Sequence, residues 1–112
     1  MPRPLRNRRD FARVYAEADK RVGRLFVLYL LAAEADATAV VASRKLGKAV
    51  RRNRAKRLLR EALRAVDVRA GGSSGPQRGV WVVAVARRAI TGAGFQEVRR
   101  ELAQLVFGRD AM

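Results

Sequence analysis

Residues 44 to 64 place two demands on any fold that this chain adopts. Their apolar residues recur at the 3.6-residue spacing of an α-helix, so one helix face must pack against a core. The same twenty-one positions hold ten of the chain's 25 basic residues and only one acid, Glu61. The opposite face carries a polar, mostly cationic stripe at Asn53, Arg57, Arg60 and Arg64. We therefore predict a helix that is half packed and half available to an anionic partner.

The balance of charge favours a nucleic acid as that partner. The formal net charge is +15, from 25 Lys and Arg against 10 Asp and Glu, and most of the basic residues are Arg. Arg presents a planar fork of donors that matches phosphate oxygens and stacks on bases. A charged helix face with no partner usually places Glu four positions from Lys or Arg, whereas Glu61 stands almost alone. Binding a polyanion would relieve the repulsion and release counterions.

Composition also weighs against several other functions. The longest apolar run, Leu25 to Ala33, is about half a membrane span, and no exposed aromatic residues accompany the basic stretch. The chain has no Cys and no His, which removes disulfides, thiolate nucleophiles, imidazole catalysis and the usual zinc sites. Its carboxylates are scattered, so no acid–base dyad or two-metal site is indicated. We read no export signal at the basic N-terminus and expect a cytoplasmic protein.

The first half of the chain is expected to form a helix and two strands within one compact domain. Asn7 is a potential N-cap, and the apolar spacing that follows it predicts a helix through Ala18. Residues 25 to 31 and 38 to 43 are predicted strands. Because the connection between them is short, we expect an antiparallel hairpin.

The second half is expected to add a helix, a strand and a helix. The basic helix begins near Gly47, where free backbone N–H groups attract phosphate, but no nucleotide-binding phosphate loop is present. Residues 67 to 79 are predicted to be a flexible loop because they are rich in Gly and Ser. A buried strand at 80 to 86 and a last helix from Thr91 or Gly92 follow. This order favours an α+β sandwich with helices on one face of the sheet.

Four residues form a second candidate surface. Alternation along the strand at 25 to 31 places Val27 and Tyr29 opposite the face of Phe26, and helical spacing places Phe11 beside Tyr15. If helices cover only the Phe26 face, the other face is open and suits unpaired nucleotides, which stack on aromatic rings. The pattern alone is equally consistent with ordinary core residues.

The segment from Ser43 to Arg60 resembles the signature of bacterial ribonuclease P proteins, including an Arg-Asn-Arg core at residues 52 to 54. Weaker matches are residues 5 to 15, the strand at 26 to 29 and the strand end at 86 to 87. The resemblance implies an α+β fold of αβββαβα order with a mixed four-stranded sheet. It also implies a left-handed βαβ crossover through the basic helix, and a cleft for the substrate leader between the sheet and the first helix.

The resemblance further implies a subunit of an endoribonuclease that removes the 5′ leader of precursor tRNA. The chemistry is expected in the catalytic RNA, with Mg²⁺ held mainly by RNA and substrate, so we expect no catalytic residue here and neither a membrane nor a DNA partner. The residues expected to bind the catalytic RNA are Arg44, Lys45, Lys48, Arg51, Arg52, Asn53, Arg54, Lys56, Arg57 and Arg60. Those expected to line the leader cleft are Phe11, Tyr15, Val27 and Tyr29.

Two other classes of function stay open on sequence grounds. A structural RNA-binding protein of the ribosomal type would use the same charge and leave the aromatic residues without a role. A DNA-binding module could place the basic helix in a major groove, although no helix-turn-helix partner and no dimerising heptad accompany it.

Overall fold

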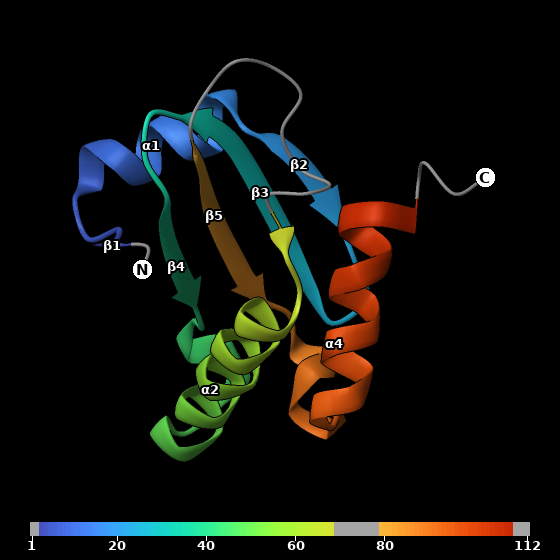
Figure 1. The fold of residues 1–112 in the computed structure, drawn as a ribbon. Helices are drawn as coiled ribbons and strands as arrows, with labels where there is room; N and C mark the ends of the chain where they lie inside the picture. Colours follow the sequence, from blue (N-terminus) through green and yellow to red (C-terminus); the bar gives the residue numbers. More distant parts are fainter. Residues whose placement is uncertain (1–2, 69–78, 109–112) are drawn as a thin grey trace.

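A mixed β-sheet forms the centre of the protein, which is seen here in a computed structural model that describes residues 3–68 and 79–108 (Figure 1). Its strand order is β1-β4-β5-β3-β2. The strands are β1 (Arg3–Pro4), β2 (Asp19–Val22), β3 (Phe26–Ala33), β4 (Ala37–Val41) and β5 (Gly79–Ala86). The four longer strands confirm the predicted mixed sheet, and the two-residue β1 extends it at the β4 edge.

The predicted hairpin between residues 25–31 and 38–43 is wrong. β5 lies between β3 and β4, and it pairs antiparallel with β3 and parallel with β4. β5 is buried along nearly its whole length, so a central position removes most apolar surface from water. β3 forms its hairpin with β2 instead, and the N–H of Gly23 donates to the Phe26 carbonyl at 2.9 Å. The predicted strand at 38–43 also ends earlier, at Val41.

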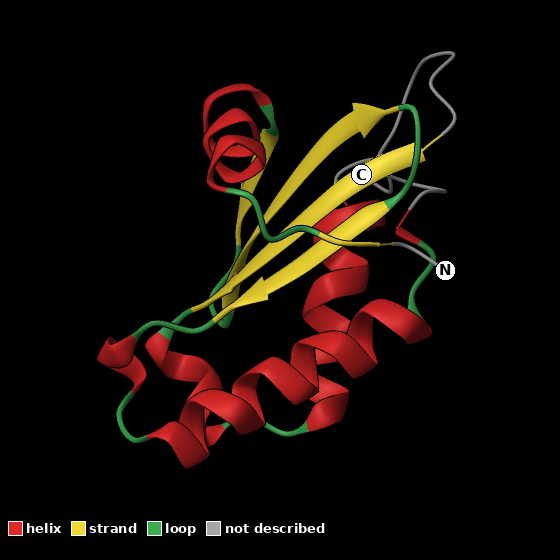
Figure 2. Ribbon diagram, turned by 90° about the vertical axis from the view of Figure 1, so that its left-hand side faces the viewer, coloured by secondary structure: helices red, strands yellow, loops and turns green. Residues whose placement is uncertain are grey.

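Helices lie on both faces of the sheet (Figure 2). The helices α2 (Ala49–Ala65) and α4 (Phe95–Ala103) cover one face, and α1 (Arg8–Glu17) packs on the other. The order of elements favoured helices on one face only, whereas the resemblance implied a first helix beside the leader-binding face. Val14 anchors α1 there and is fully buried. As predicted, Asn7 caps α1, its Oδ1 accepting from the N–H of Arg9 at 2.8 Å. None of the described helices is long and apolar enough to span a bilayer.

The larger core lies between the sheet and the helices α2 and α4. The apolar face predicted for the basic helix is confirmed, because Ala55, Leu58, Leu59 and Ala62 are all buried. The last helix begins at Phe95, later than predicted, because residues 88 to 92 form a 3-10 turn, η2. Of the predicted loop at 67–79, Val68 is buried, Gly79 belongs to β5, and residues 69–78 lie outside the described residues.

A short turn sets the start of the basic helix. After β4, Ser43 Oγ accepts from the N–H of Lys45 at 3.3 Å and begins a 3-10 turn, η1 (Arg44–Leu46). Gly47 ends that turn with φ at +113°, a conformation that side-chain-bearing residues rarely adopt. The chain then enters α2 at Ala49, and α2 serves as the crossover between the parallel strands β4 and β5.

Candidate nucleic-acid interface

The polar face of α2 points away from the protein. Asn53, Arg57, Arg60 and Arg64, which we call the basic stripe, are all exposed. Their orientation follows from the burial of the opposite face of α2, which fixes the rotation of the helix about its axis. Arg44, Lys45, Lys48 and Arg51, which precede the stripe, are exposed as well. The structure therefore places most of the predicted RNA-binding cations on the surface.

These cations have no acidic partner in the part of the chain that the structure describes. The ion pairs there are Arg13–Glu17, Arg21–Asp19 and Arg24–Glu97. None of these pairs includes a cation from residues 44 to 64. Glu61, the single acid of that segment, is exposed and also forms no ion pair within residues 3–68 and 79–108. The positive charge of α2 is thus available to a ligand.

The first turn of α2 increases the positive potential. It contains no acidic residue, and the N-cap Lys48 makes no side-chain hydrogen bond to the helix. The helix dipole adds partial positive charge at this end, and free N–H groups of a first turn bind phosphate readily. The dipole and the basic side chains therefore favour an anion at the same place.

Arg54 differs from its neighbours because it has a partner inside the protein. It is half-buried, and its Nη2 donates to the backbone carbonyl of Ala93 at 2.7 Å. Ala93 is buried and lies just before α4. The contact ties α2 to the segment that precedes α4, which the sequence did not indicate. Arg52 and Lys56 are also half-buried.

The structure brings the four predicted leader-binding residues onto one surface. Ring centroids are 6.1 Å apart for Phe11 and Tyr15, and 5.0 Å apart for Tyr15 and Tyr29, which meet edge to face. Val27 precedes Tyr29 on the same face of β3 and is half-buried. The Tyr15 side chain is 48% exposed, so a ring remains open to a ligand. Burial, and to a lesser extent the nearby Tyr29, raise the pKa of Tyr15, so its hydroxyl is neutral at pH 7.

Two residues of β2 extend this surface and were missed in the sequence. The register pairs Lys20 with Tyr29 and Val22 with Val27, so these pairs share a face of the sheet. Lys20 Nζ lies 6.0 Å from the Tyr29 ring centroid, and Val22 is 58% exposed. Residues 19 to 22 are three charged residues followed by Val22, so they show no apolar alternation from which a strand could have been predicted. We call Phe11, Tyr15, Lys20, Val22, Val27 and Tyr29 the aromatic face.

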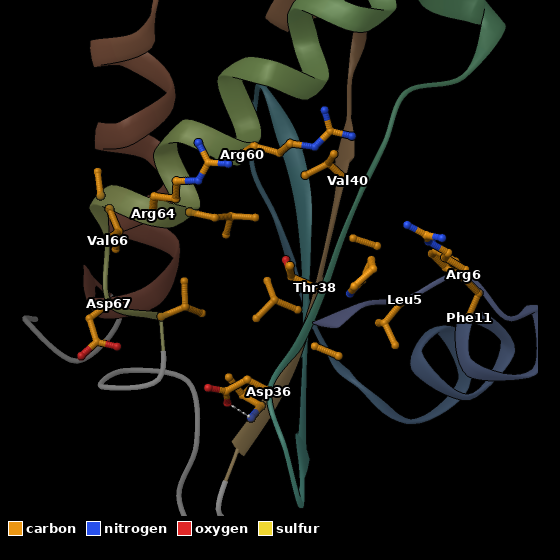
Figure 3. A pocket seen from close by; sticks show the side chains of 18 residues that line it. Leu5, Arg6, Phe11, Asp36, Thr38, Val40, Arg60, Arg64, Val66 and Asp67 are labelled. Carbon is orange, nitrogen blue, oxygen red and sulfur yellow. Dashed lines mark hydrogen bonds between the residues drawn. The ribbon is translucent and has the colours of Figure 1, made fainter. Parts of the chain in front are cut away.

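A groove of about 830 Å³ lies elsewhere, along the β4 edge under α2 (Figure 3). Arg60 and Arg64 stand on one side of it, and Leu5, Arg6 and Phe11 on the other (Figure 3). Phe11 is the one predicted leader-binding residue in its lining. The predicted leader cleft is therefore a different surface from this groove. The Oγ1 atom of Thr38, a residue of the lining, is buried without a hydrogen-bond partner.

The surface of α2 offers cations, and the aromatic face offers aromatic rings. Cations neutralise phosphates, and exposed rings stack on bases, so the chemistry available is that of RNA binding. Across residues 3–68 and 79–108, no cluster of three or more Asp and Glu side chains is arranged to hold a metal ion.

Comparison with known proteins shows extensive similarity to one family. The family model described as Ribonuclease P matches residues 2–108. The ribonuclease P protein component of Symbiobacterium thermophilum is 38% identical over 104 residues, which cover 90% of this chain and 85% of the relative. That of Caldanaerobacter subterraneus is 32% identical over 91% of this chain and 84% of the relative. The structure of the RNase P protein from Thermotoga maritima matches with a TM-score of 0.74 at 30% identity, covering 95% of this chain and 96% of that one.

Proposed function

The chain belongs to the ribonuclease P protein family, and from this premise we propose that it binds a catalytic RNA through α2 and the 5′ leader of precursor tRNA through the aromatic face. The holoenzyme that such proteins form with RNA is a tRNA-processing ribonuclease. One observation carries the proposal: within the described residues, the exposed cations of α2 have no acidic partner.

Binding of the catalytic RNA would follow from electrostatics. The cations of α2 repel one another in the free protein, and each phosphate that they neutralise reduces this repulsion and releases counterions. Arg57 and Arg60, which are exposed on the basic stripe, are the side chains best placed to reach a phosphate backbone. Affinity would therefore fall steeply as salt rises.

Binding of the leader would use different forces. Tyr15 presents a half-exposed ring that is supported by Tyr29, so an unpaired base could stack on it without rearranging the helix. Lys20 beside the Tyr29 ring would hold the leader's phosphate backbone. Because stacking contributes to this contact together with a single cation, binding of the leader would be less sensitive to salt than binding of the catalytic RNA.

We propose further that the chain contributes no reactive group. Hydrolysis would take place in the catalytic RNA, with Mg²⁺ held mainly by that RNA and the substrate. The protein would lower the electrostatic cost of bringing two polyanions together in the cytoplasm, so that substrate and Mg²⁺ bind more tightly.

A reconstitution experiment tests the proposal. Precursor tRNA and its leaderless product are offered to a ribonuclease P catalytic RNA with and without the protein, at low Mg²⁺. We expect the protein to increase cleavage and to make the complex bind the leader-bearing precursor more tightly than the product. An assembled complex that cleaves no better than the RNA alone would contradict the proposal. Assembly without discrimination of the leader would favour a structural RNA-binding role.

A further inference from the structure

The carboxylate of Glu101 on α4 holds the turn between β2 and β3. Its Oε1 accepts from the backbone N–H of Arg24 at 3.0 Å, and its Oε2 accepts from those of Leu25 and Phe26 at 2.8 and 3.2 Å. Three consecutive amides therefore converge on one anion from an element about 75 residues away in the chain. Such a cradle of N–H groups favours a full negative charge over a neutral acceptor.

One further contact holds the same turn, and another holds the strand β2 that precedes it. Arg87, which follows β5, donates from Nη1 to the carbonyl of Gly23 at 2.9 Å. Arg21, in the middle of β2, donates from Nη1 to the carbonyl of Leu105 at 2.7 Å, just beyond the end of α4. Among the described strands, β2 lies at the edge of the sheet and pairs with β3 alone, so these side chains supply support that a second neighbouring strand would otherwise provide.

β2 carries two side chains of the aromatic face. Lys20 and Val22 lie on that face, whereas Arg21 points to the opposite side, toward the segment after α4. Glu101 acts on the turn that immediately follows Val22. Contacts from α4, on the opposite side of the sheet, therefore fix the position of the β2 edge of the aromatic face.

We propose that Glu101 is a positioning residue for the leader: it fixes the β2–β3 turn and thereby the place of Lys20 and Val22 beside Tyr29 and Val27. The inference rests on the proposed binding of the leader to the aromatic face. Glu101 itself touches no substrate in this account. Its removal moves the edge of the surface and leaves the basic stripe unchanged, because the stripe is set by the packing of α2.

Replacing Glu101 by Gln tests this role with the smallest change in shape. The carboxylate uses both oxygens as acceptors, whereas an amide offers one, so at least one backbone N–H of the turn loses its partner. Glu97→Gln is the matched control, because Glu97 lies one turn earlier on α4 and its contacts among the described residues are with the Arg24 guanidinium and the Gly94 N–H, not with a backbone amide of the turn. Both variants raise the net charge by one, so a general electrostatic effect on RNA appears in both.

The measurement is steady-state cleavage and equilibrium binding by the reconstituted complex. For Glu101→Gln we expect KM and Kd for leader-bearing precursor to rise about tenfold, below the roughly hundredfold that a 1 Å misplacement can cost. The kcat, the affinity for leaderless tRNA and the affinity for catalytic RNA should stay within about twofold, which is a small effect on a binding free energy. Amide hydrogen exchange at Arg24, Leu25 and Phe26 should become faster in Glu101→Gln only.

Gly23→Ala perturbs the same contact from the other side. A Cβ at Gly23 would lie 2.5 Å from Glu101 Oε2 and 2.9 Å from the Phe26 carbonyl oxygen, so the turn must move. We expect the same selective loss of leader affinity, and less than the sum of the two effects when the variants are combined.

Three results would overturn the inference. Wild-type leader affinity in both Glu101→Gln and Gly23→Ala would show that the turn does not position the leader. An equal loss for leader-bearing and leaderless tRNA, or for catalytic RNA, would show a general structural role. A wild-type complex that does not discriminate the leader would remove the proposed function and this inference together, whereas the first two results leave the proposed function intact.

Discussion

The helices α1 and α2 both carry exposed arginines, but within residues 3–68 and 79–108 only α1 has acidic side chains that compensate its charge. Asn7 caps α1, Asp10 lies in its first turn, and Arg13 Nε is 3.8 Å from Glu17 Oε2. The Arg13 guanidinium also lies 5.1 Å from the Trp81 ring centroid. α2 has no side-chain cap, no acid in its first turn and, in the described part of the chain, no ion pair.

This difference shows that the number of arginines does not by itself identify an interface. In α1, Arg13 has a local acidic partner, and Asp10 and Glu17 screen the charge of the helix. The arginines of α2 increase repulsion in the free protein, which is a cost that only a bound anion removes.

Charge reversal should give the largest difference. The triple variant R52E/R57E/R60E on α2 and the triple variant R8E/R9E/R13E on α1 each lower the net charge of +15 by six, to +9. We expect the α2 variant to lose more than about 100-fold in affinity for catalytic RNA, and the α1 variant less than about tenfold, because in the proposed complex α2 neutralises the phosphates of the catalytic RNA. Fluorescence anisotropy at fixed salt measures both. Equal losses would mean that overall charge, and not the α2 surface, governs assembly.

Removing an aromatic ring should have the next largest effect and should reveal a role of α1 that is independent of charge. For Tyr15→Ala we expect affinity for leader-bearing precursor to fall about tenfold, as loss of one stacked base implies, with no change for leaderless tRNA or catalytic RNA. Tyr15→Phe keeps the ring and should behave as wild type in a competition binding assay. A comparable loss in Tyr15→Phe would assign the contact to the hydroxyl and contradict stacking.

Two arginines of α2 should separate stability from RNA binding. Arg54→Ala leaves the Ala93 carbonyl without its donor, so we expect the free energy of unfolding in urea to fall by about 1 to 2 kcal/mol. Arg57→Ala should change it by less than about 0.5 kcal/mol. In salt titrations, Arg57→Ala should reduce the slope of log affinity against log salt by about 1, and Arg54→Ala by much less. Reversed results would place Arg54 on the phosphate backbone.

The smallest expected effect comes from giving α2 the cap that α1 already has. Lys48→Asp supplies an acceptor and a negative charge at the N-cap, so we expect about 1 kcal/mol of added stability and roughly threefold weaker binding of catalytic RNA. Lys48→Ser supplies a cap without the negative charge, and it should stabilise α2 with a smaller loss of affinity. Stability from urea unfolding and affinity from anisotropy give the comparison. Tighter RNA binding by Lys48→Asp would contradict a phosphate near this end.

Periodicity was sufficient to predict much of the fold. The buried face of α2 and the central strand β5 follow directly from apolar spacing, because burial of those side chains is what forms the core. The pairing of the strands was not predictable in the same way. β5 enters between β3 and β4 from far along the chain, and the short strands β1 and β2 depend on their neighbours for their structure.

In the candidate site, too, features set by local spacing were predictable and long-range contacts were not. Residues that act through exposure, such as Arg57 and Arg60, were predictable because helical spacing fixes the side of the helix on which they lie. The contact of Arg54 with Ala93 and that of Glu101 with the β2–β3 turn join residues 39 and about 75 positions apart. Such contacts depend on how distant elements pack together, and no local pattern in the sequence encodes them.

The most direct test of the central claim asks which helix faces the RNA. The chain contains no Cys, so one residue can be replaced by Cys and carry a tethered iron chelate that cleaves nearby RNA. Glu61→Cys places the probe on α2 without removing a cation, and Ala16→Cys places it on the exposed side of α1. In complexes with catalytic RNA alone, we predict strand cleavage from the probe at position 61 and none from the probe at position 16. Cleavage only from position 16 would contradict docking through α2.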